Sequence, residues 1–185
     1  MKKISWLLSS FIILIVCCHP SSGQQGPSSL KRVIIIRHGE KPDQGDNLSC
    51  KGLNRALQLP DVLNKKFGTP NYIFVPAINN GKSTSTARMY QTIVPFAVKY
   101  NLQINTRYDV ADAKGLVNDL MKKDGTVLLV WEHKHIDNIL KALGLQEATK
   151  WSDDDFDSIW IVSFQNGKPV FTKDKEGINP GDDCK

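Results

Sequence analysis

Hydrophobic positions along the chain alternate between short apolar runs and longer amphipathic stretches. Residues 33–36 form a continuous β-branched run, typical of a strand buried on both faces of a parallel sheet. Residues 72–75 and 127–131 have the same character. Elsewhere apolar residues recur at helical spacing, which predicts helices over 53–67, 86–100, 114–121 and 136–143. Pro60 is expected to kink or split the first helix, and Pro95 interrupts the pattern of the second.

The C-terminal part of the chain predicts a β-hairpin, because residues 159–164 and 169–171 flank Asn166-Gly167. Residues 102–110 are expected to be extended. Strands that alternate with helices predict an α/β domain, a three-layer α/β/α sandwich. Its central sheet is expected to be mainly parallel, with an antiparallel C-terminal edge hairpin. Ligands of such sheets bind outside the carboxyl ends of the strands, so the residues that follow each strand are the candidates for chemistry.

The first 23 residues have the pattern of an export signal. Lys2 and Lys3 precede an apolar stretch over 4–18, and small residues follow at Ser21-Ser22-Gly23. A membrane-spanning helix needs about 20 apolar residues, so this stretch is short for one. We therefore predict an exported protein, periplasmic, secreted or envelope-anchored. Residues 24–31 form a flexible tether and 32–185 form the domain. The alternative is a lipoprotein signal, in which a lipid on Cys17 or Cys18 provides the only membrane contact.

Composition and charge are those of an ordinary globular domain. Hydrophobic residues make up 41% of the chain and the net charge is +5, which falls to +3 without Lys2 and Lys3. Such a mild excess does not indicate a nucleic-acid partner. Cys50 and Cys184 are the cysteines left after removal of the leader. In an oxidising compartment they are expected either to form a disulfide or to remain two thiols.

Polar side chains with phosphate chemistry follow two of the predicted strands. Arg37 and His38 come directly after residues 33–36, and His133 follows shortly after residues 127–131. Arg88 lies near the start of the helix over 86–100. A neutral imidazole is a nucleophile near physiological pH, and arginine forks suit phosphate oxygens. The pattern therefore points to phosphoryl transfer.

Four segments, taken in order, resemble the histidine phosphatase superfamily, in its phosphoglycerate-mutase-like branch. They are Arg37-His38-Gly39-Glu40-Lys41-Pro42, Leu48-Ser49-Cys50-Lys51-Gly52-Leu53-Asn54-Arg55-Ala56, the segment 84–92 with Arg88 followed by Gln91-Thr92, and the strand 127–133 that ends in histidine. The resemblance implies a phosphoglycerate-mutase-like fold. It also implies hydrolysis of a phosphomonoester through a phosphohistidine on His38, without a metal or an organic cofactor.

The resemblance also assigns roles to other residues. Arg37, Arg88 and His133 would complete the phosphate pocket, and Glu40 and Lys134 would add to substrate binding. Lys134 stands where the family often has glycine. The segment 104–112 resembles the family's proton-donor segment and places Asp112 at the acid position, with Asp109 and Glu132 as rivals. Two further functions stay open: a catalytically silent anion-binding module of the same fold, and a phosphomutase, for which the mature chain is short.

Two other patterns are weaker. Glu132, His133 and His135 together could ligate a metal, but no further ligand stands at a familiar spacing, so no metal site is predicted. The acidic run over 153–157 lacks the glycine and terminal glutamate of a calcium loop, and it is expected to be a solvated turn before a strand.

Overall fold

The computed structural model describes residues 29–78, 86–146 and 149–184. The predicted signal peptide over 1–23, most of the predicted tether and the candidate lipid sites Cys17 and Cys18 lie outside the described residues. In the part of the chain that the structure describes, no helix is both long and apolar enough to span a membrane.

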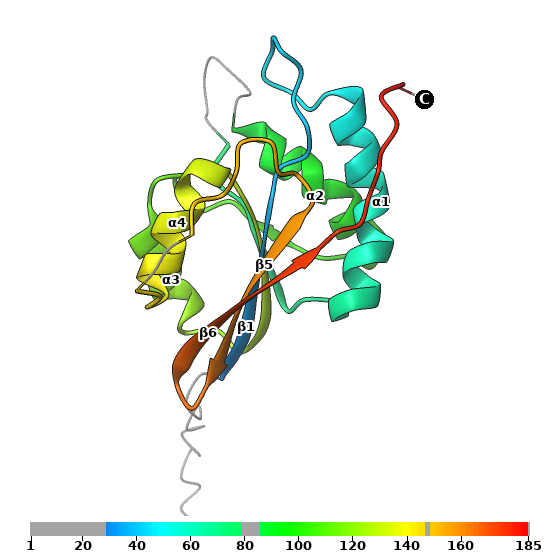
Figure 1. The fold of residues 1–185 in the computed structure, drawn as a ribbon. Coiled ribbons are helices and arrows are strands. Elements are labelled where there is room, and N and C mark those ends of the chain that lie inside the picture. The colour runs from blue at the N-terminus through cyan, green and yellow to red at the C-terminus, as the bar shows by residue number, and fades with distance from the viewer. Residues whose placement is uncertain (1–28, 79–85, 147–148, 185) are drawn as a thin grey trace, which may run out of the picture.

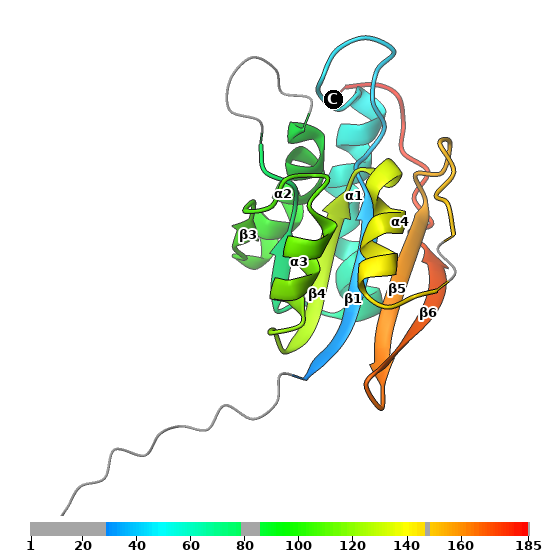
Figure 2. The same cartoon turned by 90° about the vertical axis from the view of Figure 1, so that its left-hand side faces the viewer.

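The centre of the molecule is a six-stranded mixed sheet (Figures 1 and 2). Its order is β3 (Ile104–Asn105), β2 (Tyr72–Phe74), β4 (Gly125–Trp131), β1 (Leu30–Arg37), β5 (Ser158–Gln165) and β6 (Lys168–Lys175). The first four strands are parallel, whereas β5 runs antiparallel to β1 and forms the edge hairpin with β6. Asn166 and Gly167 form the turn of that hairpin, both with positive φ. The α/β fold class with its antiparallel edge is thus confirmed.

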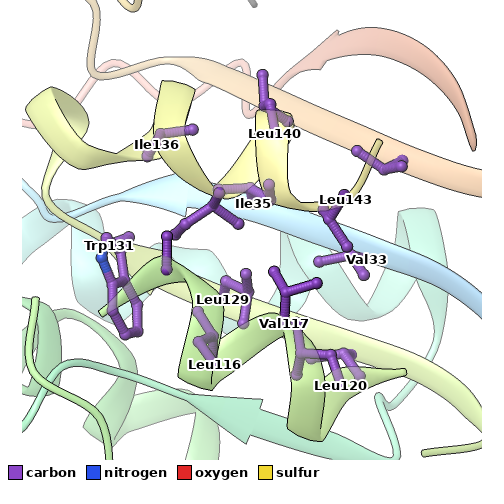
Figure 3. Close-up of a cluster of buried hydrophobic side chains, with 14 of the residues drawn as sticks. Val33, Ile35, Leu116, Val117, Leu120, Leu129, Trp131, Ile136, Leu140 and Leu143 are labelled. Atoms are coloured by element: carbon purple, nitrogen blue, oxygen red, sulfur yellow. The ribbon is translucent and has the colours of Figure 1, made fainter. Parts of the chain in front are cut away.

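Four helices cover the two faces of the sheet. Figure 1 shows α1 (Cys50–Phe67) and α2 (Ala87–Tyr100) on one face, with α3 (Ala113–Leu120) and α4 (His133–Ala142) on the other. Side chains of a strand alternate between the faces, so Ile34 and Ile36 pack toward α1 and α2. Val33 and Ile35 pack toward α3 and α4, where Figure 3 shows them among leucines of those helices. This double burial accounts for the continuous apolar run of β1.

Two local predictions differ from the structure. Strand β1 begins at Leu30, two residues before the predicted domain boundary, because Leu30 is buried and pairs with Gly125 of β4. Helix α1 continues through Pro60 without a break. Pro60 lies on the buried face of α1, and its carbonyl oxygen accepts a hydrogen bond of 3.4 Å from the Tyr100 hydroxyl of α2. Tertiary packing therefore offsets the backbone hydrogen bond that the proline removes.

Candidate active site

The ends of β1 and β4 bring the sequence-predicted residues to one edge of the sheet. Arg37 and Trp131 are paired in the parallel register, so the residues that follow them leave the sheet side by side. These are His38 after β1 and Glu132 and His133 after β4. Arg88 is the second residue of α2. The preceding residues 79–85, which include Thr84 of the motif, lie outside the described residues.

His38 is a buried imidazole with a defined tautomer. The residue is only 3% exposed, and its Nδ1 lies 2.7 Å from the Gly39 carbonyl oxygen. Because a carbonyl oxygen only accepts, Nδ1 carries the hydrogen and Nε2 keeps its lone pair. Burial, the largest cause, lowers the pKa of His38 to about 4. The charges of Arg37, Arg88 and His133 also lower it, while the bond to Gly39 opposes the shift. All three side chains therefore act on the same imidazole.

This pKa predicts how folding stability depends on pH. Since the pKa of folded His38 lies below its ordinary value of 6.5, the unfolded chain binds the proton more tightly. His38 therefore opposes folding increasingly as pH falls from 6.5 toward 4. We expect His38→Gln to be roughly 2–3 kcal/mol more stable relative to wild type at pH 4.5 than at pH 7.5. Urea unfolding at the two pH values measures this difference, and parallel curves for the two proteins would contradict it.

Arg37 is held by the loop before β5. Its Nη1 donates to the carbonyl oxygens of Ser152, Asp153 and Asp155 at 3.3, 2.8 and 3.0 Å. The guanidinium stacks on Phe156, 3.8 Å from the ring centroid. Burial lowers the pKa of Arg37 to about 10, so it remains a cation at neutral pH. Its Nε is buried and has no hydrogen-bond partner among the described residues, and a phosphate oxygen is an acceptor that satisfies such a donor.

Residues 153–157 form the solvated turn before a strand that the acidic sequence predicts, since Asp153 and Asp154 are exposed. The segment does precede β5, but its backbone carbonyls bind Arg37, and the Phe156 ring contacts His38 edge-on at 6.2 Å between centroids. The reason is topological. Because β5 runs antiparallel to β1, the start of β5 lies at the edge where β1 ends. The sequence feature that points to this arrangement is the predicted C-terminal hairpin, because one strand of a hairpin must run against the direction of the parallel strands.

Arg88 reaches from α2 to the loop after β1. Its Nη2 donates to the Gly45 carbonyl at 2.8 Å and its Nε to the Asn47 carbonyl at 3.3 Å. One turn along α2, the Thr92 hydroxyl donates to the Arg88 carbonyl and accepts the Gly39 N–H at 2.9 Å. Helix α2 thereby holds both a cation and the backbone of Gly39 beside His38.

Two glycines let the loop after β1 cross helix α1 closely. A Cβ on Gly39 would lie 2.8 Å from the Gly52 carbonyl oxygen, and one on Gly52 would lie 2.2 Å from the Glu40 carbonyl oxygen. Ser49 caps the helix by accepting the Gly52 N–H, and its own N–H donates to Glu40 at 2.9 Å. Side chains at either glycine would push His38 away from the helix.

Glu40, which the resemblance assigns to substrate binding, lies in a buried ion cluster, and its contact with a substrate stays a prediction. Both of its carboxylate oxygens accept from Arg55 of α1, at 2.8 and 2.9 Å. The third guanidinium nitrogen, Nη1, donates to Glu176 at 2.6 Å. Burial raises the pKa of Glu176 to about 8; the nearby carboxylates of Asp157 and Glu40 also raise it, while Arg55 opposes the shift. Sequence reasoning missed Glu176, which lies 121 residues from Arg55 and after the last strand.

His133 begins α4 and contacts the acidic residues beside it. Its Nε2 lies 2.8 Å from Asp153 Oδ1, and its Nδ1 lies 3.8 Å from Glu132 Oε1. The other Glu132 oxygen lies 3.3 Å from His135 Nε2. Lys134 lines a cavity of about 200 Å³ next to His133. Within the described residues, no group of three or more His, Cys, Asp or Glu side chains is arranged to hold a metal ion.

The two predicted acids of the segment 104–112 have backbone partners. Asp112 caps α3 by accepting the Gly115 N–H at 2.8 Å, and Asp109 accepts the Ala111 N–H at 2.9 Å. The described residues give neither carboxylate a hydrogen bond or ion pair with His38 or the basic residues around it. Their place as proton donors therefore stays a prediction.

The C-terminal tail runs beside the start of α1, as Figure 1 shows. The structure joins Cys50 to Cys184 through a disulfide, with Cα atoms 4.8 Å apart. The Asn54 amide donates to the Gly181 and Asp183 carbonyls, both at 2.8 Å. The tail is thus held against the helix whose first turn supports the loop after β1.

Comparison with solved structures settles the fold. The protein assigned as the phosphohistidine phosphatase SixA of Agrobacterium tumefaciens matches with a TM-score of 0.58 and 16% identity, covering 78% of this chain and 97% of the other. This chain has the histidine phosphatase fold. A mycobacterial glucosyl-3-phosphoglycerate phosphatase in complex with inorganic phosphate matches with a TM-score of 0.55 and 17% identity, covering 78% and 95%.

A third structure of this fold is a phosphoserine phosphatase variant of Entamoeba histolytica bound to phosphoserine. Its TM-score is 0.55 and its identity 16%, with coverage of 79% and 96%. The similarity covers 95–97% of each of these three proteins. No family model matches the sequence, and no curated protein is significantly similar to it.

Proposed function

We propose that this protein hydrolyses a phosphomonoester through a phosphohistidine on His38. The observation that carries the proposal is the state of that imidazole. Its pKa of about 4 keeps it neutral at physiological pH, and its Nδ1–H donates a hydrogen bond to the Gly39 carbonyl. The Nε2 lone pair is therefore available to attack phosphorus without a separate base. The shared fold with phosphatases supports the same chemistry.

Arg37, Arg88 and His133 supply the charge that the reaction needs. A phosphoryl group in transfer spreads negative charge over its equatorial oxygens, and positioned cations stabilise that charge. Arg37 is immobilised by three carbonyls and an aromatic ring, so its position costs little reorganisation when the substrate arrives. Arg88 belongs to a different element from Arg37, helix α2.

The mouth of the site favours a substrate with a further acidic group. Lys134 and Lys150 line the cavity beside His133, and both lower the pKa of Asp153. Neither lysine forms an ion pair with another described residue. In the same cavity Asp137 already pairs with Lys141 at 3.3 Å. The positive charge that remains is suited to a carboxylate or a second phosphate of the leaving group.

The test is to trap the intermediate. The protein is mixed with p-nitrophenyl phosphate, denatured within milliseconds in alkali and digested for mass spectrometry. We expect release of p-nitrophenol and a phosphoryl group of 80 Da on the peptide that contains His38, stable in alkali and lost in acid. His135→Gln serves as a control and should label equally. Absence of turnover on aryl and alkyl phosphates, with retained binding of phosphate, would favour the silent anion-binding module instead.

A further inference from the structure

The pair of His133 and Asp153 lies at the rim of the site and has two unlike ends. His133 Nε2 contacts Asp153 Oδ1 at 2.8 Å. The Asp153 side chain is 74% exposed, whereas the His133 side chain is 10% exposed. His133 Nδ1, at the other end of the ring, is buried and has no hydrogen-bond partner in the part of the chain that the structure describes. The ring therefore joins a solvated carboxylate to a buried nitrogen that has no hydrogen bond to a described residue.

The contact with Asp153 decides which nitrogen changes its protonation. The hydrogen bond from His133 is the largest cause that lowers the pKa of Asp153, so the carboxylate is ionised at neutral pH and accepts. Nε2 must then carry a hydrogen in both states of the ring. Nδ1 alone alternates between a lone pair and an N–H group, and it is the buried nitrogen.

The charges around His133 set the balance between those states. Burial is the largest cause that lowers the pKa of His133, and Arg37 of β1 adds to it. Asp153 before β5 and Glu132 before α4 raise it. His38, which follows β1, is also within electrostatic range, since His133 lowers its pKa. A bound phosphate dianion adds negative charge beside the ring, and this favours the protonated form.

We propose that His133 Nδ1 protonates the leaving oxygen and that Asp153 is the positioning residue that holds the ring and its charge. The proposal rests on the phosphatase function proposed above and supplies the acid that this reaction needs. The carboxylates of Asp109 and Asp112 accept hydrogen bonds from backbone N–H groups. Glu132 contacts His133 and His135 and is the nearest rival.

The proton and the bonds balance over one cycle. As His38 Nε2 bonds to phosphorus, the bond from phosphorus to the leaving oxygen breaks, and that oxygen takes the proton from His133 Nδ1. The alcohol departs and His133 is neutral. Water then attacks phosphorus and gives a proton to His133 Nδ1, while the bond between phosphorus and Nε2 breaks. Inorganic phosphate leaves, and both histidines return to their first state.

The experiment compares a good and a poor leaving group. Asp153→Asn removes the charge but keeps the Asp153 carbonyl that binds Arg37. Values of kcat/KM are measured for p-nitrophenyl phosphate, whose leaving group needs little protonation, and for ethyl phosphate, which needs it. We expect a loss of roughly 10–100-fold on ethyl phosphate and less than about 3-fold on the aryl ester. The alkaline limb of the pH profile should move to lower pH, because the imidazolium loses its carboxylate.

Matched variants keep the test decisive. Asp154→Asn, in the same loop, should leave kcat/KM unchanged on both substrates. Asp153→Glu should restore most of the rate on ethyl phosphate. An equal loss on both substrates would overturn the proposal, and so would leaving-group sensitivity that appears in Glu132→Gln or Asp112→Asn instead. An inactive wild-type protein would overturn the phosphatase function itself, which separates the two failures.

Discussion

Replacing His38 with alanine is expected to lower kcat on p-nitrophenyl phosphate by at least about 10⁴-fold. The substitution removes the nucleophile, and the remaining charges of Arg37 and Arg88 cannot form the covalent intermediate. Steady-state release of p-nitrophenol measures the loss. The variant should fold, because an apolar side chain at a position only 3% exposed removes the cost of burying an imidazole.

Binding separates loss of chemistry from loss of the pocket. If His38 acts as nucleophile, His38→Ala should still bind inorganic phosphate, because Arg37 and Arg88 remain, and calorimetry measures that affinity. A variant that keeps more than a tenth of the wild-type kcat would contradict covalent catalysis at His38. A wild-type protein that binds phosphate without turnover would point to the silent module.

Replacing Arg55 with alanine is expected to destabilise the fold by about 3–5 kcal/mol, because it strands buried carboxylates. Arg55 is 5% exposed and pairs with Glu40 and with Glu176, whose side chain is 1% exposed. Asp157 Oδ1 lies 4.0 Å from Arg55 Nη1 and places a further carboxyl group beside the cluster. Urea unfolding at pH 7 measures the loss.

Lys66→Ala is the matched control for Arg55. Lys66 lies on the same helix as Arg55, and its substitution removes a 3.0 Å ion pair with Asp174 of β6. Both partners are partly exposed, so the loss should cost less than about 1 kcal/mol.

The pKa of Glu176 lies above its ordinary value, so stability from this group is lost as pH rises from about 4.5 through about 8. The cost of Arg55→Ala should therefore be greater at pH 8.5 than at pH 5. Equal costs for Arg55→Ala and Lys66→Ala would contradict a central role for this cluster.

The buried cluster also connects stability to the site. Glu40 follows Gly39 and His38 directly, and its carbonyl accepts from Ser49 while its carboxylate is held by Arg55. The loop that carries His38 is therefore bound to α1 through both the backbone and the side chain of Glu40. A partial loss of the cluster is expected to reduce activity as well as stability, because the loop after β1 would lose its support.

Local periodicity and motif order determined much of this molecule from the sequence alone. The strand cores, the helices, the terminal hairpin and the resemblance to the histidine phosphatase fold all follow from residues that are near neighbours along the chain. The same is true of the position of Arg37 at the end of a strand and of His38 and His133 beyond strand ends, because a parallel sheet brings those ends to one edge.

Tertiary structure alone decided which groups bind the charged residues in and around the site. Arg37 binds carbonyls more than 110 residues away, and Arg55 binds Glu176 at a separation of 121. The contact of His133 with Asp153 depends on β5 lying beside β1, which no local pattern specifies. Hydrophobic periodicity reports which face of an element is buried, but the pairing of charges depends on strand order and register. Those two properties placed an acidic loop, which looks solvated in the sequence, against the basic residues of the site.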